Sequence, residues 1–202
     1  MARRSQKIGN QMAESGFSME EALYNILSAV VTVPHGWELT SSMKAGWKTG
    51  ISFGLTSGVI TTLGLMVGLH SGTHSRAIVI GGILTIAIAD AMSDALGIHV
   101  SEESKNSGPT WQIWEATLAT FVTKFVIAAT FVVPVAIGPL DRAIIISVVW
   151  GLLLLTVLSF FLARAQAIAP WKVIGEHLLI ALCVVVMTHV VGDWVQGIVK
   201  EE

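Results

Sequence analysis

Charged residues are scarce in this sequence, and their scarcity excludes an ordinary soluble domain. Asp, Glu, Lys and Arg make up 13% of the 202 residues, whereas soluble domains carry about 25%. Hydrophobic residues reach 53%, and the mean hydropathy is +0.71. Apolar stretches of about 20 residues, the length at which a helix crosses a bilayer, recur along the chain. The composition therefore predicts an all-α integral membrane protein.

Cysteine is almost absent, and so are the common motifs of soluble enzymes. The one cysteine, Cys183, lies inside an apolar run, so no disulfide can form within the chain. The net charge of -2 argues against a nucleic-acid partner. The sequence also lacks phosphate-binding and dinucleotide-binding loops and the Cys/His spacings of zinc sites. We expect neither enzymatic activity nor a bound cofactor.

Five apolar segments are long enough to span a membrane, and they define the domain organisation. They are predicted at about residues 50–70, 77–100, 111–137, 143–163 and 173–191. Residues 50–199 would form the transmembrane domain, and residues 1–49 a cytoplasmic N-terminal segment. Within that segment Ser18 and Glu21 form a capping-box pattern, which predicts a short amphipathic helix ending near Pro34.

The distribution of Lys and Arg predicts the orientation of the spans. If the N-terminus is cytoplasmic, the outer segments hold three such residues, Arg76, Arg142 and Lys200. The inner segments then hold eight, namely Arg3, Arg4, Lys7, Lys44, Lys48, Lys105, Arg164 and Lys172. Because positive residues gather on the cytoplasmic side, we expect the N-terminus inside and the C-terminus outside. The small size and the lack of a eukaryotic sorting signal suggest a prokaryotic plasma membrane.

Glycines recur at four-residue intervals in the first span. Gly54 and Gly58 begin the pattern, and Gly64, Gly68 and Gly72 continue it. Small residues at this spacing let helix backbones approach closely in lipid. The pattern predicts a tight helix pair or a dimer interface.

Two carboxylates interrupt the second span, where hydrocarbon is expected. Asp90 and Asp94 lie four residues apart, so both project from one face of a helix. An ionisable residue within a span costs roughly 2.5 kcal/mol or more and marks a functional site by default. Lys124 lies at a comparable depth in the third span, and a buried lysine without a partner would lose its proton. We therefore expect Lys124 to pair with Asp90 or Asp94.

Three interpretations of these charges remain open. In the first, Asp90 and Asp94 bind a cation or a proton in a transport cycle, with Lys124 as a switch or charge partner. In the second, the acids and Lys124 form a static ion pair that joins helices. In the third, the Lys124 side chain extends to the membrane surface and leaves the acids apart.

Other polar residues gather at the ends of the spans. Those on the cytoplasmic side are Glu102, Glu103, Glu115, Glu176 and His177, together with His99. Those on the outer side are His70, His74, His189 and Asp193. Imidazole and carboxylate groups suit first-row divalent metals, so each set is a candidate entry or exit site for a metal. The alternative is that they are solvated helix ends without chemistry.

Two segments resemble the vacuolar iron transporter family of divalent-metal transporters. They are GLTSGVITTLGLMVGL in the first span and ADAMSDALGIHVSEESK across the second span and its exit. Family members read approximately G-L-N-D-G-L-V-T-T and A-D-A-I-S-M-G-x-G-x-Y-L-S at these places. Pro134 and the segment THVVGDWV near the end of the fifth span fit the pattern as well. The resemblance covers roughly residues 50–195, with the same number and order of spans.

The resemblance implies a five-helix homodimer that exports Fe²⁺ or Mn²⁺ from the cytosol in exchange for protons. It implies metal ligands from an acid of the first helix and from an acid and a methionine of the second. Position by position, these ligands fall on Ser57, Asp90 and Asp94, so two of the three differ from the family's pattern. We interpret the change as a carboxylate moved between helices at similar depth, which favours harder cations such as Mn²⁺ or Mg²⁺.

The alternative to transport is a transport-silent membrane scaffold that keeps the fold and dimerises or docks to a larger complex. The short linker after the second span leaves no room for the glutamate-rich cytosolic metal-binding domain of many family members. A water-accessible cavity shared by Asp90, Asp94 and Ser57 would favour transport. A dry pair between the acids and Lys124 would favour the scaffold.

Overall fold

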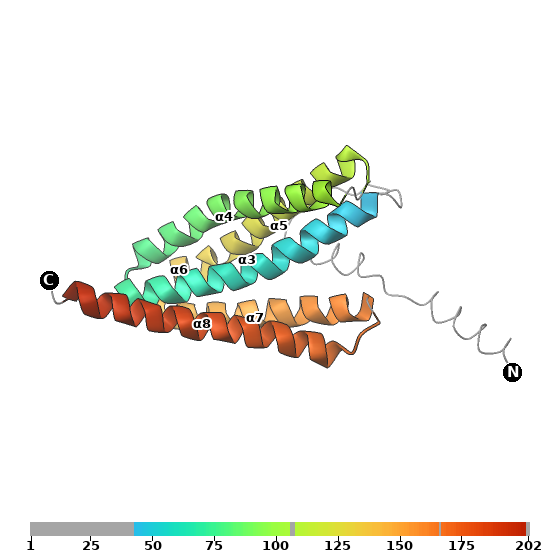
Figure 1. Cartoon of the computed structure of the whole chain (residues 1–202). Helices are drawn as coiled ribbons and strands as arrows, with labels where there is room; N and C mark the ends of the chain where they lie inside the picture. Colours follow the sequence, from blue (N-terminus) through green and yellow to red (C-terminus); the bar gives the residue numbers. More distant parts are fainter. Residues whose placement is uncertain (1–42, 106–107, 166, 201–202) are drawn as a thin grey trace, which may run out of the picture.

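The computed structural model describes residues 43–105, 108–165 and 167–200, and these ranges are helical apart from short connections (Figure 1). The amphipathic helix predicted between Ser18 and Pro34 lies outside the described residues, so it stays a prediction. Within the described ranges the chain forms no strand.

Six helices make up the described chain, and two of them form one crossing. They are α3 (Met43–Thr73), α4 (Arg76–Ser104), α5 (Thr110–Thr130), α6 (Val132–Ile137), α7 (Leu140–Ala165) and α8 (Pro170–Lys200). α5 and α6 follow each other with a break at Phe131, because Pro134 has no N–H to bond the carbonyl of Thr130. Five segments are long and apolar enough to cross a membrane. The predicted all-α fold with five spans is confirmed.

The helices extend further than the predicted spans. α3 begins seven residues before the predicted start at residue 50, and α8 continues nine residues beyond residue 191. Hydropathy marks where the chain leaves the hydrocarbon layer, whereas a helix continues into the interface because its backbone hydrogen bonds are internal.

α3 lies at the centre of the bundle, with α4 and α5 on one side and α7 and α8 on the other (Figure 1). Of the residues in its most apolar 18-residue stretch, 61% are buried, against 11% in the corresponding stretch of α8. Leu63 and Met66 of α3 are fully buried, and they pack in one core with Ile83 of α4 and Leu155 of α7. The central helix is therefore the element that organises the others.

The glycine rows of α3 form close helix pairs within the chain. A side chain at Gly54 would place its Cβ 2.8 Å from the carbonyl oxygen of Thr120 on α5. At the other end, a Cβ at Gly68 would lie 3.3 Å from the carbonyl oxygen of Thr188 on α8, and one at Gly72 equally close to Gly192 O. The first half of α3 thus packs on α5 and the second half on α8. This is the tight helix pair that the spacing predicted.

Replacing Gly50 with alanine is expected to lower the free energy of unfolding by about 1–3 kcal/mol, the usual range for overpacking. The new methyl would lie 2.7 Å from Ala119 Cβ and 2.9 Å from the backbone nitrogen of Thr120. At Gly81 nothing lies within 4 Å, so alanine there should stabilise by about 0.5–1 kcal/mol through helix propensity. Unfolding by SDS in mixed micelles measures both. Equal effects at the two sites would contradict the packing described here.

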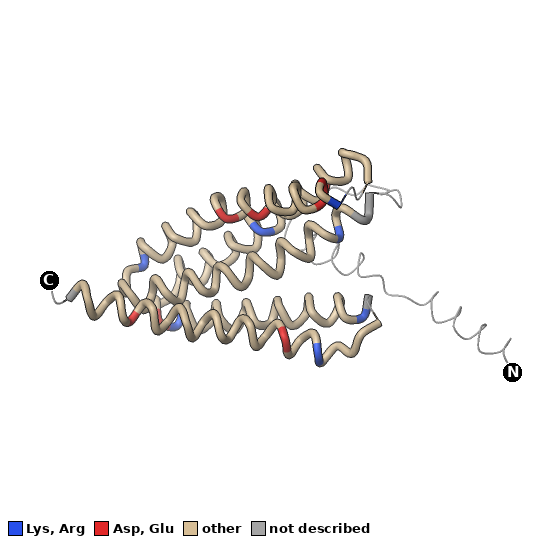
Figure 2. The backbone as a smooth tube through the Cα atoms, in the orientation of Figure 1, with Lys and Arg blue, Asp and Glu red and all other residues tan. Residues whose placement is uncertain are grey.

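Charged residues lie mainly near the two ends of the bundle, apart from one group on α4 and α5 (Figure 2). The end where α3 begins carries Lys48, Lys105, Arg164 and Lys172. Arg76 and Arg142 lie at the opposite end, where Arg76 donates hydrogen bonds to the carbonyl oxygens of Ala136 (3.1 Å) and Gly138 (2.7 Å). Which end faces the cytosol stays a prediction.

Candidate functional site

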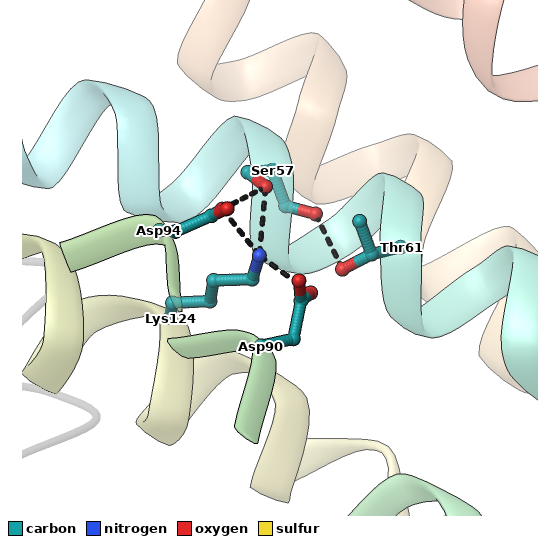
Figure 3. Close-up of polar contacts among 5 residues, drawn as sticks. All are labelled: Ser57, Thr61, Asp90, Asp94 and Lys124. Carbon is teal, nitrogen blue, oxygen red and sulfur yellow. Dashed lines mark hydrogen bonds and ion pairs between the residues drawn. The ribbon is translucent and has the colours of Figure 1, made fainter. Parts of the chain in front are cut away.

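The inner face of the bundle holds a buried lysine between two carboxylates (Figure 3). Lys124 of α5 is 1% exposed and is among the largest fully buried side chains. Its Nζ lies 2.5 Å from Asp90 Oδ2 and also forms an ion pair with Asp94 Oδ2. The expected pairing is present, and it involves both acids of α4. The interpretation in which Lys124 extends to the membrane surface is wrong, because the two carboxylates hold it inside.

Ser57 of α3 completes the cluster. Its hydroxyl donates a 2.6 Å hydrogen bond to Asp94 Oδ2 and accepts one of 2.9 Å from Lys124 Nζ. The Ser57 carbonyl in turn accepts a hydrogen bond from Thr61 Oγ1 at 2.9 Å. Three helices therefore supply the four polar groups that meet here. We call Ser57, Asp90, Asp94 and Lys124 the charge cluster.

The glycines of α3 let α5 approach closely enough for Lys124 to contact the other members of this cluster. A Cβ at Gly58 would lie 3.3 Å from Lys124 Cγ, and one at Gly54 would lie 3.3 Å from the Lys124 backbone nitrogen. Any larger residue at these positions would push α5 away from α3. The four-residue glycine spacing thus positions Lys124 as well as packing the helices.

The charge cluster carries one unmatched negative charge, because it has two carboxylates and a single ammonium. The Asp90 and Asp94 side chains are 28% and 22% exposed, whereas Lys124 is almost completely enclosed. Asp90 Oδ2 is buried and, among the described residues, has the Lys124 ion pair but no hydrogen bond. An uncompensated charge in a low-dielectric environment is costly, so a further positive charge beside the two acids would stabilise this arrangement.

An open groove of about 470 Å³ runs along the surface between α3 and α4 and reaches one member of the cluster. Its lining residues are Leu65, Leu69, Ile78, Gly82, Thr85, Ile86, Ala89 and Asp90. Neither Asp94 nor Ser57 lines it, so the candidate ligands do not share this groove. Across residues 43–105, 108–165 and 167–200, no three His, Cys, Asp or Glu side chains are arranged as a metal site.

The polar residues predicted at the cytoplasmic side have separate partners. Glu102 Oε1 accepts a 3.0 Å hydrogen bond from Lys105 Nζ within an ion pair, and Glu103 is exposed on the same helix. His99 Nδ1 lies 2.9 Å from Thr117 Oγ1, and its ring packs edge-on against Trp114.

On the other helices of this end, Glu115 of α5 has a buried Oε2 with no hydrogen bond from the described residues. Glu176 of α8 is exposed, and His177 Nδ1 lies 2.7 Å from Ser159 Oγ of α7. The side chains predicted for this end therefore belong to three helices, α4, α5 and α8, and do not converge on one point.

At the opposite end the structure brings α3, α7 and α8 together through polar contacts. His70 Nε2 lies 3.4 Å from Asp141 Oδ1, and the His70 ring centroid is 5.2 Å from that of His74. Ser71 donates hydrogen bonds to Asp193 and, at 3.0 Å, to the His189 carbonyl oxygen.

His189 and Asp193 also contact each other, with 3.5 Å between Nε2 and Oδ2. Gln196 Nε2 lies 2.9 Å from His74 Nδ1. All four residues predicted for the outer side therefore lie at one end of the bundle.

Sequence reasoning missed three members of this group, namely Ser71, Asp141 and Gln196. Asp141 follows the Gly138-Pro139 turn and lies in the first turn of α7, next to the end of α3. An acidic residue in the first turn of a helix is common for dipole reasons, so it carries no functional signal by itself. Gln196 lies seven residues after His189, on the same face of α8. This spacing was the signal by which the sequence could have placed Gln196 with His189.

Comparison of the chain with protein-family models, with curated proteins and with solved structures gives no match. The resemblance to the vacuolar iron transporters therefore stays a prediction from the two segments that carry it. What the chain itself establishes is an integral membrane protein of five helical spans with a charge cluster between three of them.

Proposed function

We propose that the protein exports a divalent metal cation, Fe²⁺ or Mn²⁺, from the cytosol in exchange for protons. The proposal depends on one observation: the buried Lys124 ammonium lies among two carboxylates and a hydroxyl from α4 and α3 (Figure 3). Three oxygen-bearing side chains directed at one point make a site for a cation. In the state described here, an ammonium that belongs to the chain occupies that site.

The charges of the cluster explain why metal binding would release a proton. With Lys124 charged, the cluster has a net charge of minus one. A divalent ion beside a charged lysine would leave it at plus one, whereas a divalent ion beside a neutral lysine brings it to zero. The neutral arrangement is favoured in a low-dielectric surrounding. One proton would therefore leave for each metal ion bound, which is the coupling that an antiporter requires.

The ligand types agree with a first-row divalent cation. Carboxylate and hydroxyl oxygens suit Mn²⁺ and Mg²⁺, and a neutral amine adds affinity for Fe²⁺. The histidines and carboxylates near both bundle ends support routes to and from the cluster, since they would attract and exchange such ions. The cytoplasmic N-terminus, the prokaryotic plasma membrane and a homodimer belong to the same proposal.

A transport-silent scaffold is the second candidate, and the packing of the cluster favours it. Asp94 and Ser57 contact Lys124 directly, and of the charge cluster only Asp90 lines the described groove. Polar side chains of this kind join helices in membranes without moving anything. In that case the ion pairs would be permanent, and the apolar faces of α4 and α8 would contact lipid or a partner protein.

Flux into proteoliposomes distinguishes the two candidates. The purified chain would be reconstituted with a pH-sensitive dye inside, and Mn²⁺, Fe²⁺ or Mg²⁺ would be added outside with the membrane potential clamped. Transport predicts metal uptake with one proton moving the opposite way per ion, and no such signal in protein-free vesicles. Absence of flux for every cation, from protein that remains folded and monodisperse, would exclude the transporter and favour the scaffold.

A further inference from the structure

The groove between α3 and α4 has the size of a ligand site and leads to a charge. Its volume of about 470 Å³ falls within the range of small-molecule sites, about 300–1,000 Å³. Four of its eight lining residues are large aliphatics, Leu65, Leu69, Ile78 and Ile86, and Asp90 is the one ionisable residue among the eight. An apolar groove with a carboxylate at one place is complementary to a molecule with an apolar body and a cationic head.

The walls of the groove exclude strongly hydrated and anionic ligands. Thr85 is the only hydroxyl-bearing lining residue, and its Oγ1 already donates a 2.8 Å hydrogen bond to the Gly81 carbonyl. Among the lining residues, Asp90 alone would compensate a ligand's lost hydration, and it is negative. A metal ion with its water shell, a sugar or a phosphate would leave polar groups unsatisfied there.

The charge of the cluster specifies the charge of the ligand. Lys124 balances one of the two carboxylates, so one negative charge is unmatched. Asp90 Oδ2 is held by Lys124 and buried, and the exposed 28% of the side chain lies on its remaining atoms. A single positive charge beside that exposed part would bring the cluster to zero without displacing Lys124 or moving a proton.

We infer that the α3–α4 groove binds a monovalent lipophilic cation, an amine or quaternary ammonium with an apolar tail, whose head contacts Asp90. The tail would lie along Leu65, Leu69 and Ile78, in the direction of the end where α4 begins. Such a ligand reaches the groove from the lipid, because the groove is open on the outer surface of the helix pair. This inference goes beyond metal transport and does not depend on it.

Binding to the full chain in lipid nanodiscs tests the inference in the absence of divalent metal. Radiolabelled decyltrimethylammonium is the probe, and decanol is the uncharged competitor with the same tail. We expect saturable binding of one equivalent per chain above that of empty nanodiscs. Unlabelled decyltrimethylammonium should displace it, and decanol should not.

Two variants and one control identify the site. Asp90→Asn removes the charge, and Ala89→Leu fills the groove beside it while keeping the charge cluster intact. Each is expected to weaken binding at least tenfold. Ile180→Leu, on the exposed face of α8 away from the groove, should bind as the unaltered chain does.

Three results would overturn the inference. Equal displacement by decanol would mean that the groove takes an acyl chain without regard to charge. Undiminished binding by folded Ala89→Leu would place the ligand elsewhere. Absence of saturable binding, the result if lipid or a second copy fills the groove, would exclude the ligand altogether.

Discussion

Replacing Lys124 with methionine is expected to lower the free energy of unfolding by about 3–5 kcal/mol, the cost of breaking a buried ion pair by removing one partner. The substitution keeps the length and apolar stem of the side chain but leaves Asp90 and Asp94 without their cation. It also removes the donor to Ser57. SDS titration in mixed micelles, followed by circular dichroism, measures the loss. A change below about 1 kcal/mol would contradict a stabilising role for the cluster.

Two further variants separate the lost ion pairs from the altered side chain. Lys172→Met changes a lysine at the start of α8 whose Nζ lies 5.5 Å from the Trp171 ring centroid, at the exposed surface. It should leave stability nearly unchanged, since exposed charges contribute little. In the triple variant Asp90→Asn, Asp94→Asn, Lys124→Met no buried charge is left unpaired, so it should recover more than half of the loss.

Asp90→Asn is expected to reduce metal flux in proteoliposomes at least tenfold, if the proposed transport takes place. Asparagine keeps the shape of the side chain but removes the charge that a divalent ion needs, and it leaves Lys124 balanced by Asp94 alone. The comparison is initial uptake per folded protein against Ser93→Ala, an exposed position on the same helix. Flux of Asp90→Asn within twofold of the unaltered chain would place the transported ion outside the cluster.

Asp94→Met tests the same site through selectivity. A thioether is a softer ligand than a carboxylate, so preference should move from Mn²⁺ toward Fe²⁺. A tenfold change in the flux ratio would correspond to about 1.4 kcal/mol. An unchanged ratio in an active variant would remove Asp94 from the ligands.

The number of spans and the grouping of the acids were predictable because both depend on local pattern. Apolar length identifies a span, and four-residue spacing places Asp90 and Asp94 on one face of α4 whatever the tertiary structure. That Lys124 would contact both acids was not predictable. It depends on how α5 is rotated about its axis and on its distance from α3, and neither is encoded in the sequence near Lys124.

The role of the glycines shows the same limit. Their spacing indicates a close helix contact, but it does not say which helix is the partner. The structure shows that one row serves two partners, with Gly54 against α5 and Gly68 against α8. The His70–Asp141 contact likewise joins residues 71 positions apart in sequence, at a place where the chain offers only a helix start as a signal.

The division of the charge cluster among the helices has a mechanical consequence. Both carboxylates belong to α4, whereas Lys124 and Ser57 belong to α5 and α3, the pair that glycines hold in backbone contact. A displacement of α4 as a rigid rod would carry both acids away from their partners in a single step. The ion pairs and hydrogen bonds of the cluster therefore tie α4 to the pair formed by α3 and α5, and their loss would free α4 as a unit.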